Sequence, residues 1–454
     1  MGDDLLIVVP DKGLGNASYL VDLGDGRALA VDASRDLRDL RRSAEARGLR
    51  VVFAADTHLH ADFLSGAVQL AATGDAEVLA SRAGGREFPH RGLEDGDEVD
   101  LGGLTLRAIG TPGHTDEHLS FLLLDGRREI GVFTGGSLIV GSAARVDLVA
   151  PERTEELARA QYHSLLRLTQ LDDATALWPT HGGGSFCSSS ATGAGAVSTV
   201  GTERATNPLL RAGDEDTFVD LLLATQGSRP AYFDRLGEIN RRGPRVVGAA
   251  PVLDAIPATE AAALVADGAE LVDVRPVRSF ASGHPAGALS IPLRPAFASW
   301  LGWLAPHDRP IVVLREEGQD AQDLIWQAIK IGYENLRGEV AGGIGAWAAA
   351  GLPVASLPLV GPDEVDGARV LDIRQDSEYA AGHLPGADHV ELGDLVDRAE
   401  HVEDLPTVVM CGHGERAAGA ASLLARAGRR DVRILDGGPA DVADVLGVDL
   451  QGDG

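Results

Sequence analysis

Three histidine-containing motifs in the first half of the chain carry side chains whose types and spacing suit a metal ion. In the first motif His58, His60 and Asp62 stand at alternate positions, so an extended loop could direct all three side chains toward one point. His114 and His181 come from the other two motifs, and each follows a strand-like segment. Zinc and iron accept imidazole and carboxylate donors, so we expect one metal site. The motifs are DTHLHADFLSG at 56–66, GTPGHTDEHLSF at 110–121 and WPTHGGGSFC at 178–187.

A cysteine in the motif VVMCGHGER at 408–416 could carry a different chemistry, that of a sulfur nucleophile. Cys411 stands between a strand-like segment and a predicted helix at 417–427, where free backbone N–H groups point at the loop. These dipoles and Arg416 are expected to stabilise the thiolate, which can attack and then hold a sulfane sulfur atom. Glycine lets such a loop curl with its amides inward. We expect the persulfide to be cradled by Gly412, His413, Gly414 and Glu415.

Short apolar segments separated by turns must position the metal motifs within residues 1–245. Strands that follow one another in meanders, rather than in regular alternation with helices, indicate a layered α/β domain. The pattern predicts strands at 5–9, 18–23, 28–32, 51–54, 105–109, 119–124 and 131–134, and helices at 36–47, 66–73 and 152–171.

The C-terminal part contains one unit twice, after a Pro- and Gly-rich linker at 246–257. Each copy combines a strand, a turn reading SGHPAGA or AGHLPGA, a second strand and a helix. This order predicts two α/β domains with parallel sheets, at 258–356 and 358–451. In the first copy Arg315 stands at the nucleophile position, followed by acidic residues. Because arginine cannot carry sulfur, we expect that copy to be a structural or docking domain.

Composition and charge restrict the partners and the compartment. A net charge of −28 repels polyphosphate, so neither nucleic acid nor an anionic membrane is an expected partner. The two cysteines, Cys187 and Cys411, are far apart in the sequence and offer no disulfide framework. Two unpaired thiols fit a reducing compartment. The acidic residues 1–4 contain no basic segment of a signal peptide, and no apolar run reaches the ~18–20 residues of a membrane span. We therefore expect a cytoplasmic protein.

The order H-x-H-x-D, T-P-G-H-T, F-T-G and P-T-H resembles the metallo-β-lactamase superfamily. Within it, THLHADF and TPGHT are similar to the persulfide dioxygenases, especially the bacterial type fused to rhodanese domains, whose hallmarks the CGHGER loop and the AGHLPGA turn resemble. The resemblance implies an αββα sandwich followed by two rhodanese domains. It also implies one iron(II) held by His58, His114 and an aspartate at 136, a substrate such as glutathione persulfide, and a homodimer.

The chain departs from the family pattern at two candidate ligand positions. Gly136 stands where the aspartate of F-T-G-D is expected, and Phe63 stands where dinuclear members have a histidine. Both changes remove ligands of a second metal, so a dinuclear hydrolase is disfavoured. Two ligand sets for a single zinc or iron ion stay open: His58, His60 and His114 with Asp62 and His181 nearby, or His58 and His114 completed by Asp62 or water.

Two further residues are candidates for substrate contact. Arg145 in SAARVDL matches an arginine of the family and could hold the carboxylates of a thiol such as glutathione, or it could pair with Asp147. Cys187, at the end of GGGSFC, could be a small buried hydrophobe or a thiol near the metal that receives or relays sulfur.

Three functions fit these motifs. In the first, the metal domain oxidises a thiol persulfide to sulfite with O2 and Cys411 transfers sulfane sulfur. In the second, a single zinc hydrolyses a thioester and the rhodanese domains supply recognition. In the third, the metal site has decayed and only Cys411 performs chemistry. We favour the first, because the product of one domain is then a substrate of the other.

Overall fold

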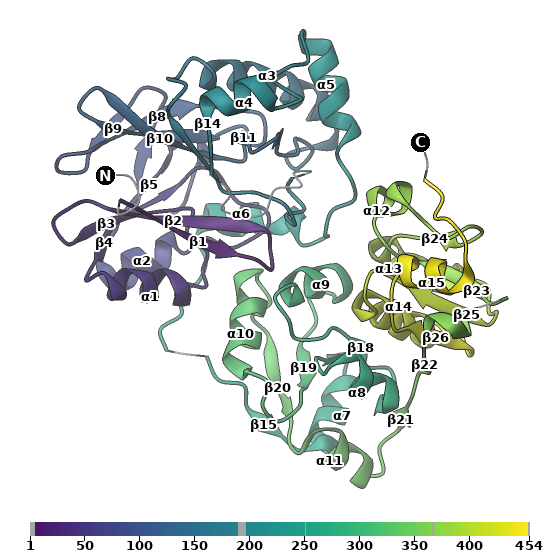
Figure 1. The fold of residues 1–454 in the computed structure, drawn as a ribbon. Coiled ribbons are helices and arrows are strands. Elements are labelled where there is room, and N and C mark those ends of the chain that lie inside the picture. Colours follow the sequence, from purple (N-terminus) through teal and green to yellow (C-terminus); the bar gives the residue numbers. More distant parts are fainter. Residues whose placement is uncertain (1–4, 189–196, 250, 366, 453–454) are drawn as a thin grey trace. The chain divides into compact units, whose positions relative to one another are not determined.

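The computed structural model describes residues 5–188, 197–249, 251–365 and 367–452 (Figure 1). The chain divides into two units, residues 1–250 with 329–332 and residues 251–328 with 333–454. The acidic residues 1–4, and position 250 of the expected linker, lie outside the described residues. The first unit contains the histidine motifs, and the second contains both copies of the repeated sequence.

Two six-stranded sheets form the centre of the first unit. One has the strand order β1-β2-β3-β4-β5-β6 and the other the order β14-β13-β10-β9-β8-β7. The strands of the first sheet are β1 (Leu6–Asp11), β2 (Asn16–Asp22), β3 (Arg27–Val31), β4 (Arg50–Asp56), β5 (Glu77–Ser81) and β6 (Arg91–Leu93). Those of the second are β7 (Glu98–Asp100), β8 (Thr105–Gly110), β9 (Leu119–Asp125), β10 (Arg128–Gly135), β13 (Ala176–Pro179) and β14 (Ser198–Thr199).

Helices cover the outer face of each sheet. Helices α1 and α2 pack on the first sheet, and α3, α4 and α5 lie over the second (Figure 1). A short hairpin, β11 (Leu138–Ile139) with β12 (Ser142–Ala143), follows β10 directly. The helices are α1 (Arg38–Ala46), α2 (Ala67–Gly74), α3 (Thr154–Leu168), α4 (Val200–Thr206), α5 (Glu215–Ala224) and α6 (Phe233–Arg242), with 3-10 turns η1 (Arg82–Gly84) and η2 (Pro151–Arg153).

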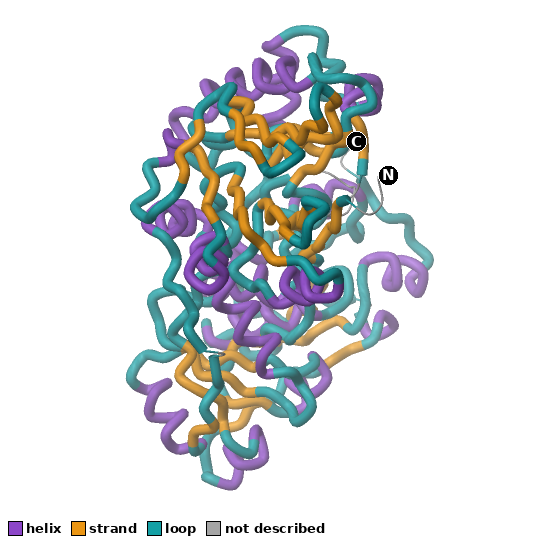
Figure 2. Tube along the Cα trace, turned by 90° about the vertical axis from the view of Figure 1, so that its left-hand side faces the viewer, coloured by secondary structure: helices purple, strands orange, loops and turns teal. Residues whose placement is uncertain are grey.

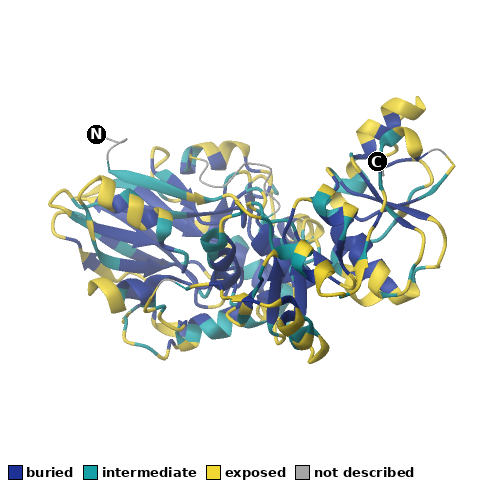
Figure 3. Ribbon diagram, turned by 90° about the horizontal axis from the view of Figure 1, so that it is seen from below, coloured by how far each residue is buried: buried dark blue, intermediate teal, exposed yellow. Residues whose placement is uncertain are grey.

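The apolar side chains of this unit form three layers of core. Tyr19 of β2 and Phe133 of β10 meet between the two sheets, with ring centroids 5.3 Å apart. Leu165 and Phe218 pack between the second sheet and its helices, and Leu70 belongs to the layer beneath α1 and α2. Figure 3 shows the sheet strands as buried and the outer helix faces as exposed. The predicted αββα sandwich is therefore confirmed.

The second unit contains two five-stranded parallel sheets with equivalent strand orders, β15-β20-β19-β16-β18 and β22-β26-β25-β23-β24. The first copy contains β15 (Ala255–Ile256), α7 (Ala258–Ala266), β16 (Glu270–Asp273), α8 (Val277–Ser282), β17 (His284–Pro285), β18 (Leu289–Ser290), α9 (Phe297–Leu304), β19 (Ile311–Leu314), α10 (Ala321–Lys330), β20 (Leu336–Val340), α11 (Gly343–Ala349) and β21 (Val354–Ala355). The second contains β22 (Leu359–Val360), η3 (Pro362–Glu364), β23 (Arg369–Asp372), α12 (Asp376–Ala381), β24 (Asp388–His389), α13 (Leu392–Arg398), η4 (Ala399–His401), β25 (Thr407–Met410), α14 (Glu415–Arg426), β26 (Val432–Leu435) and α15 (Pro439–Leu446). Both predicted parallel α/β copies are thus confirmed.

The same internal clamp supports both copies. Arg374 forms an ion pair with Asp372 at 2.7 Å and donates to the carbonyl oxygen of Gly382 at 2.8 Å. Arg275 makes the corresponding bonds to Asp273 and Gly283, at 2.6 and 2.7 Å. The clamp joins the end of β16 or β23 to a glycine of the SGHPAGA or AGHLPGA turn, which explains why the two turns read so alike.

The helices of both units are short segments, as the tube in Figure 2 shows. Among the described residues no helix is long and apolar enough to cross a membrane.

Candidate metal centre and sulfur-transfer loop

The histidine motifs meet at one end of the αββα sandwich, where each follows a central strand. His58 and His60 lie after β4, His114 after β8, and His181 after β13. All four side chains are at most 1% exposed. The ring centroids of His58, His114 and His181 form a triangle with sides of 4.8, 5.3 and 5.4 Å. The structure therefore brings together the residues that the sequence offered as metal ligands.

One ring nitrogen of His58 and of His114 is fixed by a neighbour, which orients the other toward the centre. Nδ1 of His114 donates to the carbonyl oxygen of Arg145 at 2.6 Å, and Nδ1 of His58 lies 2.8 Å from Oγ1 of Thr57. Such hydrogen bonds set the tautomer and the ring orientation of metal-binding histidines. Each ring thereby turns Nε2 inward.

His181 is oriented by an asparagine from the opposite sheet. Oδ1 of Asn16 accepts from Nδ1 of His181 at 3.0 Å, while its Nδ2 donates to Oδ2 of Asp62 at 2.7 Å. The contact needs a close approach of two loops, since a Cβ atom on Gly15, where φ is +71°, would lie 2.1 Å from the backbone nitrogen of Ser185. Asn16 thus fixes two candidate ligands at once.

A buried aspartate holds His60 and joins the two sheets. Asp32 has φ of +50°, a backbone conformation that non-glycine residues rarely adopt. Its carboxylate lies 3.2 Å from Nε2 of His60, accepts from the backbone and hydroxyl of Thr57 at 2.7 and 2.8 Å, and accepts from the hydroxyl of Thr180. His60 stacks on Phe63 with ring centroids 4.2 Å apart. Nδ1 of His60 is therefore the nitrogen left for a ligand.

Several donor atoms at this centre have no partner within the described part of the chain. Nδ1 of His60, Oδ1 of Asp62 and Nε2 of His114 are buried and make no hydrogen bond to any described residue. Leaving such groups unpaired costs roughly 1–3 kcal/mol each, and coordination to a metal ion would satisfy a buried imidazole nitrogen of this kind. The donor set thus fits a metal. Three groups have donor atoms within 4.8 Å of one another: His58, His60 and His181; His114, His181 and Cys187; Asp32, Asp56 and His60.

Gly136, directly after β10, offers no carboxylate to this centre. Its backbone N–H donates to Nε2 of His118 at 3.1 Å. A Cβ atom at this position would lie 2.2 Å from Cδ2 of His114, so the imidazole occupies the space in which a longer side chain would begin. The family resemblance implied an aspartate at 136. In this structure the His114 ring packs against Gly136 where that side chain would begin.

Burial keeps most of these imidazoles neutral. Burial, followed by neighbouring imidazoles, lowers the pKa of His58 and His118 well below the usual value. Burial also lowers the pKa of His114, to about 3. Burial acts in the same direction on His60, but the carboxylate of Asp32 outweighs it and raises the pKa of that imidazole. Neutral imidazoles keep the lone pairs that metal ligation requires.

Asp62 and Cys187 lie at the same centre. Burial opposes ionisation of Asp62, but the neighbouring His181 lowers the pKa of that carboxyl group below its usual value. Burial, together with the charge of Asp62, raises the pKa of the Cys187 thiol well above its usual value. Cys187 is 1% exposed, so its thiol faces this buried polar centre rather than solvent.

Of the two roles considered for Arg145, the structure shows the ion pair with Asp147. Its Nε and Nη2 atoms pair with the carboxylate of Asp147 at 2.7 and 2.8 Å. The remaining N–H groups donate to the carbonyl oxygens of Phe186, Ser228 and Gly227 at 3.0, 3.4 and 2.9 Å. All five donors of the guanidinium are therefore occupied, which leaves none for a substrate.

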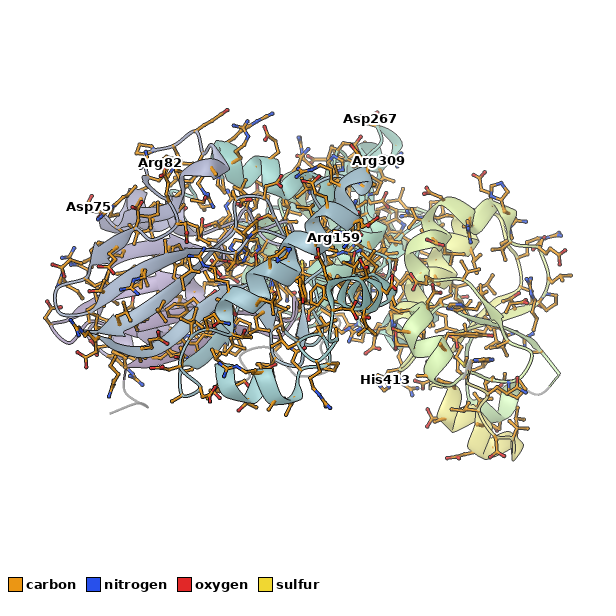
Figure 4. All side chains as sticks on the ribbon, turned by 90° about the horizontal axis from the view of Figure 1, so that it is seen from above. Asp75, Arg82, Arg159, Asp267, Arg309 and His413 are labelled. Atoms are coloured by element: carbon orange, nitrogen blue, oxygen red, sulfur yellow. The ribbon has the colours of Figure 1, made fainter. Side chains whose placement is uncertain are left out.

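In the second repeated copy, Cys411 lies at the end of β25, directly before α14. Its Sγ atom accepts from the backbone N–H groups of Gly414 at 3.1 Å and Ala417 at 3.4 Å. Gly414 has φ of +91°, which turns its amide toward the sulfur. His413 is exposed at the tip of the loop, where Figure 4 labels it. This loop therefore surrounds one sulfur atom with backbone donors.

Arg416 is held beside this loop from two sides. Its guanidinium pairs with Glu378 at 2.5 and 2.8 Å and lies 5.6 Å from the ring centroid of Trp300. Glu415 begins α14, and a Cβ atom on Gly412 would lie 3.4 Å from Nη2 of Arg416. The expected residues of the loop thus lie together, although Arg416 already has a carboxylate partner.

The first copy has a different loop at the equivalent position. Arg315 follows β19 and its Nη2 donates to Oε1 of Glu339 at 2.8 Å. Its Nη1 donates to the carbonyl oxygen of Gln319 at 3.0 Å, inside the loop. Ion pairing therefore replaces the sulfur cradle here.

Several residues of the metal centre were not among the sequence candidates. Asp32, Asn16 and Thr57 contact candidate ligands. Thr180 donates to Asp32, and His118 bonds both Gly136 and Thr111. His118 stands inside the GTPGHTDEHLSF motif, so its position was a usable signal. Asp32 and Asn16 each stand at a strand end. Many polar residues share such a position, so it did not identify them as residues of the site.

Comparisons with known proteins agree with this division. Residues 11–181 match the model of the metallo-beta-lactamase superfamily, and residues 257–350 and 361–443 match that of the rhodanese-like domain. A metallo-beta-lactamase structure from Staphylococcus aureus subsp. aureus COL is 29% identical, with a TM-score of 0.66 over 74% of this chain and 98% of that one.

Named relatives each match a part of the chain. Human persulfide dioxygenase ETHE1 is 29% identical over 198 residues, which cover 43% of this chain and 70% of the relative. A hydroxyacylglutathione hydrolase from Acidiphilium cryptum is 36% identical over 119 residues, 26% of this chain and 44% of the relative. Thiosulfate sulfurtransferase GlpE from Pseudomonas fluorescens is 44% identical over 73 residues, 16% of this chain and 67% of the relative.

Proposed function

Since the chain belongs to the metallo-β-lactamase superfamily through its first unit and to the rhodanese-like family through its second, we propose that it is an enzyme of persulfide metabolism. The first unit oxidises a small thiol persulfide, such as glutathione persulfide, to sulfite, and Cys411 transfers sulfane sulfur. The observation that carries the proposal is that one chain contains both sites. Buried donor atoms without a hydrogen-bond partner, such as Nε2 of His114, form the first site, and the Cys411 sulfur bonded by backbone amides forms the second.

In the first unit, the metal would be held among His58, His114 and His181, whose ring centroids lie 4.8, 5.3 and 5.4 Å apart, with His60 and Asp62 as neighbouring donors. An iron(II) ion there would supply the capacity to activate O2, whereas zinc would supply a Lewis acid. The overall reaction consumes one O2 and one water per persulfide and yields sulfite and the free thiol. Human persulfide dioxygenase, a relative of this unit, supports the assignment.

The protein's own residues contribute orientation and exclusion of water. Thr57, Asn16 and the Arg145 carbonyl hold one nitrogen of each central imidazole, so the inward nitrogens need little reorganisation when a metal binds. The residues around the centre are buried, which keeps bulk water away from a reactive sulfur species.

In the second unit, the proposed chemistry is displacement at sulfur. The Cys411 thiolate attacks the sulfane sulfur of a donor such as thiosulfate, so an S–S bond forms on Cys411 and sulfite leaves with its electron pair. An acceptor thiolate then attacks the outer sulfur, and the Cys411 thiolate is regenerated. Backbone N–H groups of Gly414 and Ala417 stabilise the anionic sulfur in both steps.

Oxygen uptake tests the first half of the proposal. Protein loaded with iron(II) should consume O2 and release sulfite when glutathione persulfide is added, and protein treated with a chelator should not. The hydroxyacylglutathione hydrolase relative makes hydrolysis the competing activity. Cleavage of lactoylglutathione under anaerobic conditions, without O2 uptake on persulfide, would replace the oxidation with a hydrolase function.

A further inference from the structure

We propose that the thiolate of Cys187 is a ligand of the metal and forms, with His114 and His181, a site that replaces the carboxylate missing at Gly136. The inference rests on the proposed metal function of the first unit and names one of its ligands. It differs from the expectation that Cys187 is an apolar filler or a sulfur relay.

The geometry of three donor atoms carries the inference. The sulfur of Cys187 and one ring nitrogen each of His114 and His181 all lie within 4.8 Å of one another. All three side chains are 1% exposed. Nε2 of His114 is buried and makes no hydrogen bond to any described residue, so it points at this space without a partner. A zinc or iron ion bound by two imidazoles and one thiolate has donors of this kind at separations of this order.

The backbone of one residue sets the positions of two of these ligands. The Arg145 carbonyl oxygen accepts from Nδ1 of His114 at 2.6 Å, and the Arg145 N–H donates to the carbonyl oxygen of Cys187 at 2.9 Å. The Cys187 N–H donates to Oγ of Ser185 at 3.2 Å. The Arg145 side chain is itself anchored by Asp147. The backbone of Cys187 is therefore fixed relative to His114 through their shared contact with Arg145.

Charge favours a second anionic donor here, in addition to the carboxylate of Asp62. A divalent ion is stabilised by anionic ligands, and Gly136 offers none. Its Cα faces the His114 ring so closely that a side chain cannot enter without moving that ring. Cys187 reaches the same ion from the opposite loop. On binding, the thiol releases its proton to solvent and the sulfur lone pair forms the bond to the metal, so no electrons are gained or lost.

Cobalt(II) substitution tests the ligand directly, because a cobalt–thiolate bond produces a charge-transfer band in the near ultraviolet. Cys187 and Cys411 are the two cysteines of the chain, so Cys411→Ser leaves Cys187 as its one thiol. We expect the band in the unmodified protein and in Cys411→Ser, and its loss in Cys187→Ser. Metal affinity of Cys187→Ser, measured by competition with a chromophoric chelator, should fall by at least about tenfold.

The outcomes separate this inference from the proposed function. If the unmodified protein binds cobalt without a thiolate band, Cys187 is not a ligand, and the metal function stands on the histidines and Asp62. If it binds no metal, both fail. Cys187→Ala provides a second variant should Cys187→Ser not fold. The presence or absence of the band in the unmodified protein and in Cys411→Ser tests the inference without any change at position 187.

Discussion

A Cβ atom on Gly136 would lie 2.2 Å from Cδ2 of His114, so the glycine and the imidazole share one space. The position is thus not an aspartate site with its side chain removed. The ring fills that space while its Nδ1 is bonded to Arg145 at 2.6 Å.

Gly136→Asp should therefore weaken metal binding, not restore it. The new side chain must displace His114, which breaks the hydrogen bond to Arg145 and costs roughly 1–3 kcal/mol. Gly136→Ala serves as the matched control, because it introduces the clash without a carboxylate. Chelator competition and urea denaturation measure both effects. Tighter binding in Gly136→Asp than in the unmodified protein would contradict the packing argument and support a decayed aspartate site.

Arg145 should prove structural. Arg145→Ala leaves the carboxylate of Asp147 and several carbonyl groups without their partner, and we expect a loss of about 3 kcal/mol in the free energy of unfolding. Arg145→Lys should recover only part of it, since an ammonium cannot reproduce the planar fork. Urea titration gives the values. If both variants unfold like the unmodified protein but show a raised KM for persulfide, Arg145 contacts the substrate after all.

Stability of the metal-free protein should fall as the pH drops below neutrality. Burial lowers the pKa of His114 to about 3, whereas an unfolded histidine titrates near about 6.5. Between these values the unfolded chain binds a proton that the folded chain does not, so the free energy of unfolding decreases by an order of a few kcal/mol. His58 and His118 shift in the same direction.

His60 acts in the opposite direction. Its raised pKa contributes stability at low pH that is lost as the pH rises through the folded value, and it offsets part of the trend. Urea midpoints of chelator-treated protein at several pH values measure the sum. His114→Asn should flatten the dependence, and an unchanged slope in that variant would argue against the depressed pKa.

Sulfur transfer should depend on Cys411 alone. Cys411→Ser removes the nucleophile, so the rate of thiosulfate–cyanide sulfur transfer should fall to background. Circular dichroism shows whether the variant stays folded. Persistent transfer in a folded Cys411→Ser protein would assign the sulfurtransferase chemistry to another group.

A cysteine placed at the equivalent position of the first copy should not restore transfer. Arg315→Cys, introduced into Cys411→Ser, creates a thiol but removes the partner of Glu339. The new cysteine is followed by Glu316 and Glu317, where Gly412 and His413 follow Cys411. These two carboxylates would repel an anionic sulfur donor, so we expect no transfer at this position. Recovery of cyanide-dependent thiocyanate formation would show that a cysteine is sufficient in this fold.

The sequence was informative where pattern and chemistry coincide. Strands such as β9 (Leu119–Asp125) were found nearly at their bounds, because buried sheet strands read as short apolar runs. The histidines were found because three motifs each follow a strand. The long helix was predicted at 152–171, whereas α3 covers Thr154–Leu168, preceded by a 3-10 turn that begins at Pro151. Local signals place helix ends only within a few residues.

Roles that depend on contacts distant in sequence could not be read in advance. Asn16 and His181 are 165 positions apart, and neither sequence context suggests the other. Arg145 matched a family pattern, but only the fold shows that Asp147 and three carbonyl groups use its donors. The side chain of Asp32 likewise acquires its role from β3 meeting the loops after β4 and β13.

The Asp–Arg clamp is present in both repeated copies, Asp273 with Arg275 and Asp372 with Arg374, while the nucleophile is present in one. Within one chain, the residues that shape this domain are therefore present with and without the cysteine of the proposed sulfur transfer. The turn, strands and clamp of the first copy form with Arg315 in place of a cysteine. In a domain of this kind the loop that carries the cysteine can therefore differ while the strands, the turn and the clamp stay the same.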